Sequence, residues 1–256
     1  MTILTAVVLG IVEGITEFLP ISSTGHLILA EKLAGMQTTD MLESFDIVIQ
    51  LGAILAVVVI YAKSLLRTPK IWLPIFVAFL PTAVIGLALH HILKTYLLGN
   101  TTVVALSLLM GGIVIIAFEA KYKERRGAVK RIEDVSLPTA IGIGLCQSIA
   151  IVPGVSRSAA TIIGGMMLGV DRKTIVDFSF LLAIPTMAAA TGYDLVKSAH
   201  AFSSHDALTL LVGFIVAFVT ALIAIRWLLS FIRSHTFTPF GIYRVLVGLL
   251  FLLWIR

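Results

Sequence analysis

The sequence predicts an all-α polytopic membrane protein with six transmembrane helices and two re-entrant helix hairpins, arranged as an inverted repeat. The first observation is composition: of 256 residues, 59% are hydrophobic and only 13% are charged, about half the charge of a soluble domain. The second is that several long stretches contain no Asp, Glu, Lys or Arg. The third is that two shorter apolar regions are interrupted by similar motifs.

Composition also excludes several classes of function. A mean hydropathy of +1.05 rules out an ordinary cytosolic enzyme and a disordered protein. The net charge of +5 fits cationic loops beside an anionic membrane better than a nucleic-acid partner. The single cysteine, Cys146, excludes a disulfide framework and a cysteine-based metal site. We therefore expect membrane lipids, and no nucleic acid, among the partners.

Six stretches are candidate spans, because a membrane helix needs about 20 apolar residues. Three lack charge throughout, one includes Asp46, one is long enough if it is extended backwards through Asp177, and the last carries Arg244 in its interior. We expect Arg244 to form a structural ion pair, although a lipid phosphate is the alternative. In chain order the spans are 45–62, 71–93, 95–118, 178–193, 207–225 and 237–255.

Two regions are too broken to cross the membrane, and we expect each to form a re-entrant hairpin, at about 1–33 and 135–171. The first could be read as a signal peptide, but it lacks a basic start and contains two glutamates. The interruptions are Glu13, Glu17 and Pro20 in the first region, and Pro138, Pro153, Gly154 and Arg157 in the second.

The broken regions indicate an internal repeat within a single membrane domain, 1–256. Residues 20–25 and 153–158 align at an offset of 133, as do Phe45 and Phe178. The predicted repeats are 1–130 and 131–256, each with one hairpin followed by three spans. Because three crossings is an odd number, the second copy must be inverted in the bilayer, and the hairpins should meet near the midplane.

Loop charge predicts the orientation. Basic residues favour cytoplasmic loops, and one set of loops holds twelve of them against four in the other. Both termini and the mouth of the first hairpin should therefore face the side of the membrane opposite the cytoplasm. The basic residues are Lys63, Arg67, Lys70, Lys121, Lys123, Arg125, Arg126, Lys130, Arg131, Arg172, Lys173 and Arg233 on the cytoplasmic side, and Lys32, Lys94, Lys197 and Arg256 outside.

The first hairpin carries an acidic pair and a run of hydroxyl residues. Glu13 and Glu17 are spaced to share one helix face, so they need a bound cation, a basic partner or a shared proton unless they face water at the hairpin mouth. The run from Ser22 to His26 could simply cap the next helix. That explains one hydroxyl, and leaves Ser23, Thr24 and His26 available for phosphate binding or catalysis.

The second hairpin is an expected anion site. A helix that starts near Ser156 presents its free amides and positive dipole end to the gap, together with Arg157, Ser158 and Thr161. The alternative is that Arg157 only pairs with a glutamate of the first hairpin. Brought together, the two hairpins suit hydrolysis of a phosphate ester or pyrophosphate. Ser23 or water would attack, and Glu13 and Glu17 would hold a divalent ion.

Several motifs resemble those of the bacterial undecaprenyl-diphosphatase family, the bacitracin-resistance phosphatases. The resemblance covers essentially the whole chain and rests on long, specific motifs. The matching segments are Glu13-x3-Glu17, Phe18 to His26, Val48 to Gly52, Pro153-Gly-x-Ser-Arg-Ser-x-x-Thr161 and Phe237-x-Pro239-Phe-x-x-Tyr243-Arg244.

The resemblance implies a substrate, a cofactor, an oligomeric state and a set of site residues. It implies hydrolysis of undecaprenyl diphosphate outside the plasma membrane, which recycles the lipid carrier of peptidoglycan synthesis and confers bacitracin resistance. It also implies a divalent metal ion, Mg²⁺ or Ca²⁺, and a homodimer. The implied residues are Glu13, Glu17, Ser23, His26 and Arg157, with Ser156 and Thr161 supporting the phosphate.

Some alternatives stay open. The nucleophile could be Ser23 with His26 as base and Glu17 orienting it, His26 itself, or a metal-bound water; we favour Ser23. Asp46 and Gln50 share a helix face and either support the site or bond to a neighbouring helix. Inverted repeats also occur in transporters, so the second functional hypothesis is a transporter or flippase for a polyprenyl phosphate lipid.

Overall fold

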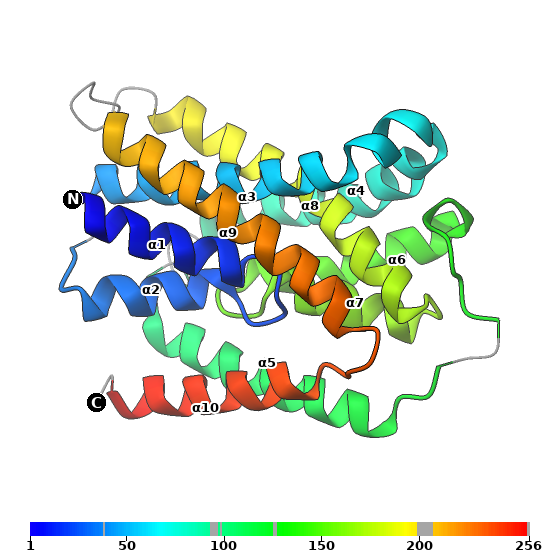
Figure 1. Ribbon diagram of the computed structural model, residues 1–256. Coiled ribbons are helices and arrows are strands. Elements are labelled where there is room, and N and C mark those ends of the chain that lie inside the picture. The colour runs from blue at the N-terminus through cyan, green and yellow to red at the C-terminus, as the bar shows by residue number, and fades with distance from the viewer. Residues whose placement is uncertain (38, 93–96, 98, 125–126, 199–206, 255–256) are drawn as a thin grey trace.

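The computed structural model describes residues 1–37, 39–92, 97, 99–124, 127–198 and 207–254. In these residues the fold consists of helices and their connections, with one isolated bridge between Val129 and Val170 (Figure 1). The α-helices are α1 (Ile3–Thr16), α2 (Ser23–Leu33), α3 (Asp40–Arg67), α4 (Trp72–Ile92), α5 (Thr101–Lys121), α6 (Leu137–Ser148), α7 (Arg157–Met167), α8 (Arg172–Ser198), α9 (Ala207–Phe231) and α10 (Thr238–Trp254).

The prediction of an all-α multi-pass membrane protein is confirmed. Helices α3, α4, α5, α8 and α9 are each long and apolar enough to cross a bilayer. The sixth predicted span, α10, has 17 residues, a length of about 25 Å at 1.5 Å per residue, which is at the lower end of the spanning range. Large apolar side chains such as Leu87, Leu211 and Leu250 are exposed along these helices, as expected for surfaces that face lipid.

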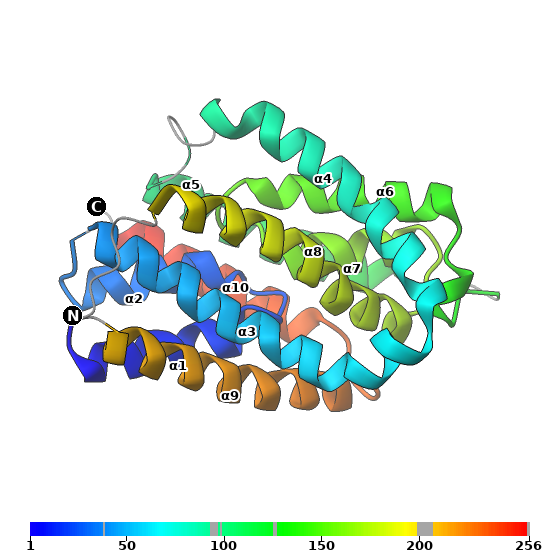
Figure 2. The ribbon, with the colours of Figure 1, turned by 90° about the horizontal axis from the view of Figure 1, so that it is seen from above.

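The order of elements repeats once along the chain. Two short helices and then three long ones make up α1 to α5, and the same order recurs in α6 to α10. Figure 1 shows the α1–α2 hairpin at the end of the bundle where both chain ends lie, and α6 and α7 towards the other end, near the connection between the halves. The view from above in Figure 2 shows the same separation. The two short hairpins therefore enter the bundle from opposite ends.

Matching hydrogen bonds join each hairpin to the other half. The Thr82 hydroxyl of α4 donates to the Gly144 carbonyl of α6 at 3.0 Å. The Thr220 hydroxyl of α9 lies 3.3 Å from the Gly10 carbonyl of α1, and shares its proton with the Val216 carbonyl of its own helix at 2.7 Å. At each crossing the helices are too close for a larger side chain, because a Cβ at Gly10 or Gly144 would collide with a facing carbonyl. These crossings hold the first helix of each hairpin against a long helix of the opposite half.

The orientation and repeat boundaries remain predictions. Of the basic residues that were counted for orientation, Lys94, Arg125, Arg126 and Arg256 lie outside the described residues, as does the side chain of Lys197. The side chains of His90 and His91, which the sequence places at a span end, also lie outside them.

Candidate active site

Each hairpin breaks at a serine with an unusual backbone conformation. Ser22 has φ 74° and ψ 98°, and Ser156 has φ 77° and ψ 114°. These are the only non-glycine residues with positive φ in the described chain, a conformation that costs roughly 1–2 kcal/mol for an L-residue. Each serine is the N-cap of the second helix of its hairpin. The two breaks are therefore geometrically alike.

A cavity of about 250 Å³ lies between the two breaks. The N-termini of α2 and α7 both contribute to its wall, so their free amides and positive dipole ends favour an anion there. The sequence predicts an anion site at the second hairpin, and in the structure the N-terminus of α2 lines the same cavity as that of α7. The lining residues are Glu17, Ser22, Ser23, Thr24, Gln50, Ala150, Pro153, Gly154, Ser156, Arg157, Met187 and Ala190.

Three predicted residues form a connected group at this cavity. The Ser23 hydroxyl donates to Oε2 of Glu17 at 2.5 Å, and Nη2 of Arg157 donates to Oε1 of the same carboxylate at 3.2 Å. The Glu17 side chain is 8% exposed and that of Arg157 is 12% exposed. A carboxylate that accepts a hydrogen bond from a serine is placed to take its proton, while the guanidinium lies where it can contact a phosphate oxygen.

Arg157 is held by the surrounding helices as well as by Glu17. Its Nη1 donates to the Ser179 carbonyl of α8 at 2.8 Å, and the guanidinium lies over the Phe18 ring at 5.7 Å from its centre. Its Nε is buried without a hydrogen-bond partner among the described residues. The side chain is therefore fixed in place, and its Nε–H has no acceptor among the described residues and is available for a ligand.

Glu13 is fully buried, and both of its carboxylate oxygens lack a hydrogen-bond partner in the described structure. The charged groups that act on it are Glu17, Asp46 and Arg157. Because an isolated buried carboxylate is costly, its free oxygens are compatible with a bound cation. No group of three or more His, Cys, Asp or Glu side chains gathers around a metal position in the described residues.

Two predicted phosphate-binding residues do not line the cavity. The Ser158 hydroxyl donates to the Leu19 carbonyl of the first break at 2.8 Å, and the Thr161 hydroxyl donates to the Arg157 carbonyl at 2.7 Å. Both side chains are fully buried. The Ser158 hydroxyl serves the contact between the two hairpins and the Thr161 hydroxyl bonds within α7, whereas Thr24 and Ser156 do line the cavity.

His26 is also absent from the cavity wall. Its Nδ1 lies 2.7 Å from the Ser22 carbonyl oxygen, and its Nε2 lies 2.7 Å from the Tyr243 hydroxyl of α10. The sequence suggested His26 as a base for Ser23, but Glu17 accepts the serine hydrogen bond in this structure.

The two predicted residues on α3, Asp46 and Gln50, differ in whether they line the cavity. Gln50 lines the cavity, while Asp46 does not and instead acts on Glu13 through its charge. Oδ1 of Asp46 is buried without a hydrogen-bond partner among the described residues.

Comparison with known proteins identifies the family. Residues 6–250 match the family described as bacitracin resistance protein BacA. The chain belongs to this family. It is 53% identical to an undecaprenyl-diphosphatase of Aquifex aeolicus, with 98% of each chain covered. It is 51% identical to the protein of that name from Sulfurihydrogenibium, with 99% of this chain and 100% of the relative covered. It is 48% identical to that of Persephonella marina over the whole of both chains.

Arg244 has a role in this BacA-family chain that sequence reasoning missed. The expected carboxylate partner is absent from the described contacts, and all five N–H groups of the fully buried guanidinium donate to backbone carbonyls. These carbonyls come from both breaks and from α5, so Arg244 ties the two hairpins to α5 and α10. The acceptors are Pro20, Ser107, Leu108, Gly154 and Val155, at 2.8 to 3.3 Å. A lone arginine inside an apolar span was the signal that pointed to it.

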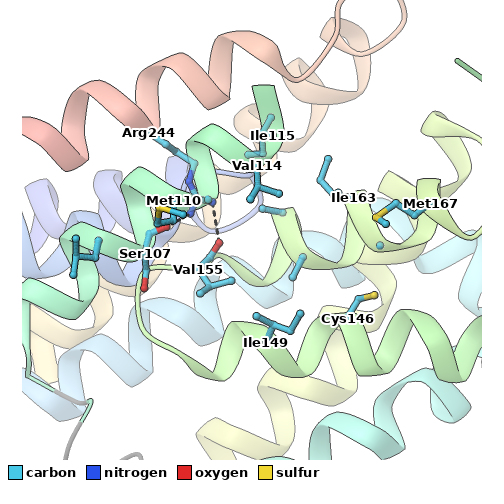
Figure 3. Close-up of a pocket in the computed structure, with 15 residues that line it drawn as sticks. Ser107, Met110, Val114, Ile115, Cys146, Ile149, Val155, Ile163, Met167 and Arg244 are labelled. Atoms are coloured by element: carbon cyan, nitrogen blue, oxygen red, sulfur yellow. Dashed lines mark hydrogen bonds between the residues drawn. The ribbon is translucent and has the colours of Figure 1, made fainter. Parts of the chain in front are cut away.

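An apolar groove of about 470 Å³ lies on the other side of the second break (Figure 3). Val155 and Arg244 line this groove, while Gly154 and Ser156 line the cavity. The second break therefore separates an apolar space between α5 and α7 from the polar space that holds Arg157.

Proposed function

We propose that this chain hydrolyses undecaprenyl diphosphate to undecaprenyl phosphate and inorganic phosphate, which recycles the lipid carrier for peptidoglycan synthesis and confers bacitracin resistance. The observation that carries the proposal is the Ser23–Glu17–Arg157 group at a cavity where two helix N-termini meet. The names of the relatives support the choice of substrate.

The first step is attack by Ser23 on the terminal phosphorus. Its Oγ forms a bond to phosphorus, the bond from phosphorus to the bridging oxygen breaks, and undecaprenyl phosphate leaves. The proton of Ser23 passes to Oε2 of Glu17, which already accepts its hydrogen bond. Arg157 and the N-terminal amides of α2 and α7 stabilise the negative charge on the transferred phosphoryl group.

The second step regenerates the enzyme. A water molecule attacks the phosphoserine, and the proton that it loses passes to Glu17 once Glu17 has returned its own proton to Oγ of Ser23. Oγ of Ser23 leaves phosphorus and takes back a proton from Glu17, and phosphate is released. This assignment makes Glu17 acid and base in turn.

The metal expected for this family would be held by Glu13, whose two carboxylate oxygens are buried without hydrogen-bond partners among the described residues, although Glu13 does not itself line the cavity. Mg²⁺ or Ca²⁺ bound there would neutralise charge on the diphosphate. Glu17 is the other predicted ligand, although Ser23 and Arg157 already occupy both of its oxygens.

Phosphate release from undecaprenyl diphosphate by the purified protein tests the activity itself. Rapid quenching of the enzyme with a substrate labelled in its terminal phosphate tests the nucleophile. We expect a label that survives acid and is lost in alkali, as phosphoserine is, in the peptide that contains Ser23. A label that is lost in acid and survives alkali, on His26, would contradict the proposed step, and so would a Ser23→Ala protein with unchanged turnover.

We further propose that the halves form an inverted repeat, with the active site and both termini outside and two copies forming a dimer. The matched Thr220–Gly10 and Thr82–Gly144 hydrogen bonds support the repeat. Single cysteines at Gly127 and at Thr2 should differ in labelling by an impermeant thiol reagent in intact cells, with only the second labelled. Equal labelling would contradict the topology, and a monomeric mass by light scattering in detergent would contradict the dimer.

A further inference from the structure

His26 is bonded through both ring nitrogens. Nδ1 lies 2.7 Å from the Ser22 carbonyl oxygen, which can only accept a hydrogen bond, so Nδ1 carries the proton. In the neutral ring Nε2 is then an acceptor, and the Tyr243 hydroxyl at 2.7 Å donates to it. The two rings are stacked, with centres 5.5 Å apart and planes 7° from parallel. Tyr243 thus selects one tautomer and one orientation of His26.

The two hairpins hold their strained serines differently. At the second break, the Ser156 side chain caps its own helix by accepting from the Ala159 amide at 3.3 Å. Ser22 makes no such side-chain bond in the part of the chain that the structure describes. Instead its carbonyl accepts from the side chain of His26, and the residue in the matching position of the second hairpin is Ala160. The Ser22 carbonyl thus accepts from both the backbone N–H of His26, at 3.3 Å, and its imidazole, whereas the Ser156 carbonyl accepts from the backbone N–H of Ala160 at 3.0 Å. The imidazole holds the first turn through its carbonyl, and the serine side chain holds the second.

The position of this turn matters because Ser23 follows it directly. Ser23 lines the cavity and donates to Glu17 at 2.5 Å, whereas His26 and Tyr243 do not line the cavity. A change at His26 therefore reaches the cavity through the backbone of Ser22. A hydroxyl displaced by even 1 Å loses alignment with both its base and the phosphorus.

We propose that Tyr243 and His26 are positioning residues, which hold the Ser22 turn so that the Ser23 hydroxyl points at Glu17. This rests on the proposed function, in which Ser23 attacks. Tyr243 is adjacent to Arg244, which bonds to carbonyls of both breaks, so one turn of α10 fixes the geometry of the whole site.

Two substitutions of His26 separate positioning from chemistry. The amide of Asn can replace the Nδ1–H donor to the Ser22 carbonyl, while the longer Gln places its amide near the Nε2 position. His26→Asn should keep kcat within about tenfold of the native value, and His26→Gln should lose at least about tenfold more, the effect of one hydrogen bond. If His26 were the nucleophile or the base, both variants would lose activity equally, which would overturn the proposal.

Tyr243→Phe tests the hydrogen bond between the Tyr243 hydroxyl and His26. We expect kcat to fall about tenfold with little change in KM, and no further fall when the substitution is added to His26→Asn, which has no Nε2 to orient. The matched control is Tyr61→Phe, which removes a hydroxyl hydrogen bond to Asp177 of 2.5 Å between α3 and α8. That control should lower the unfolding temperature and leave kcat unchanged. An unaltered kcat in Tyr243→Phe, or an additive loss in the double variant, would contradict the proposal.

The tautomer itself can be measured without turnover. In ¹⁵N-histidine-labelled protein in detergent, with the His26 signal assigned through His26→Asn, two-bond correlations should show a protonated Nδ1 and an unprotonated Nε2. A protonated Nε2 in the neutral ring would overturn the positioning role, even where Tyr243→Phe fails to fold. Failure of Ser23 labelling with the expected tautomer present would instead count against the proposed nucleophile alone.

Discussion

The two hairpin breaks share a backbone and differ in chemistry. Ser22 and Ser156 have nearly the same φ and cap equivalent helices, yet the next residue is the hydroxyl of Ser23 in one half and the guanidinium of Arg157 in the other. Repetition thus supplies two helix N-termini facing one cavity, and substitution supplies an attacking group on one side and a cation on the other. A symmetric fold holds an asymmetric site.

The two halves also differ in the helix that precedes each break, α1 in the first half and α6 in the second. Glu13 of α1 corresponds to Gln147 of α6 when the two strained serines are aligned. Gln147 donates to the hydroxyls of Thr82 at 2.8 Å and Thr186 at 3.2 Å, whereas the Glu13 carboxylate has no hydrogen-bond partner among the described residues. The second half has a polar side chain with hydrogen-bond partners where the first keeps a buried carboxyl group without one. An unpartnered buried carboxyl group is costly for the fold, so we attribute its presence to the reaction.

Removing the cation of the second break should have the largest effect. Arg157→Lys cannot reproduce the planar pair of donors, and we expect kcat/KM to fall about 10²–10³-fold, as for loss of a donor to a developing anion. Phosphate release measures it. The matched control, Arg131→Ala in the exposed pair with Glu133, should retain full activity; an equal loss in both variants would remove the special role of the second break.

Exchanging the counterparts Glu13 and Gln147 tests the asymmetry directly. Glu13→Gln should lower kcat/KM at least about 10- to 100-fold, the loss seen even for outer partners of a metal, and should raise the Mg²⁺ concentration needed for half activity. Gln147→Glu should lower the unfolding temperature without creating activity, because it buries a charge among hydroxyls. Unchanged metal dependence in Glu13→Gln would contradict the metal assignment.

Removing hydrogen bonds between Arg244 and the two breaks should mainly lower the stability of the fold. Arg244→Lys has three donors for five carbonyls and leaves some of them unpaired, at roughly 1–3 kcal/mol for each. Thermal unfolding in detergent should show a clearly lower midpoint, while the exposed Arg226→Lys should not change it. A native midpoint in Arg244→Lys would show that these carbonyls do not depend on the guanidinium.

The smallest effect is expected at the matched helix crossings. Thr82→Val removes a hydrogen bond between halves, worth about 0.5–1.5 kcal/mol, whereas Thr220→Val removes a longer contact whose proton is shared with the Val216 carbonyl of the same helix. The loss should be greater at Thr82, because its hydroxyl also accepts from Gln147. Denaturant unfolding of both variants measures the difference, and a greater loss at Thr220 would contradict this reading of the two crossings.

Much of this arrangement follows from local sequence. Charge-free length located the long helices, and proline and glutamate interruptions located both hairpins. The proline motifs align at an offset of 133, but the strained serines align at 134, because the second break is one residue longer. Ser23 therefore corresponds to Arg157 and not to Ser156. Backbone torsion angles decide this register, and residue identity alone could not.

Side-chain direction was the part that the sequence could not predict. Ser158, Thr161 and His26 belong to the same motifs as Ser23 and Arg157, yet their polar atoms bond to backbone carbonyls or to Tyr243. Helix rotation about the break determines which hydroxyls face the cavity. The hydrogen-bond partners of Arg244 could not be predicted from the sequence either, because backbone carbonyls exposed by a broken helix have no sequence signature.

The stereochemical course at phosphorus shows directly whether Ser23 attacks the substrate. The terminal phosphoryl group of the substrate can be made chiral with sulfur and oxygen isotopes, and the configuration of the released thiophosphate can then be determined. Attack by Ser23 followed by attack of water gives two inversions, so we expect net retention of configuration. Net inversion would mean that water attacks the diphosphate directly, and would contradict the role assigned to Ser23 and Glu17.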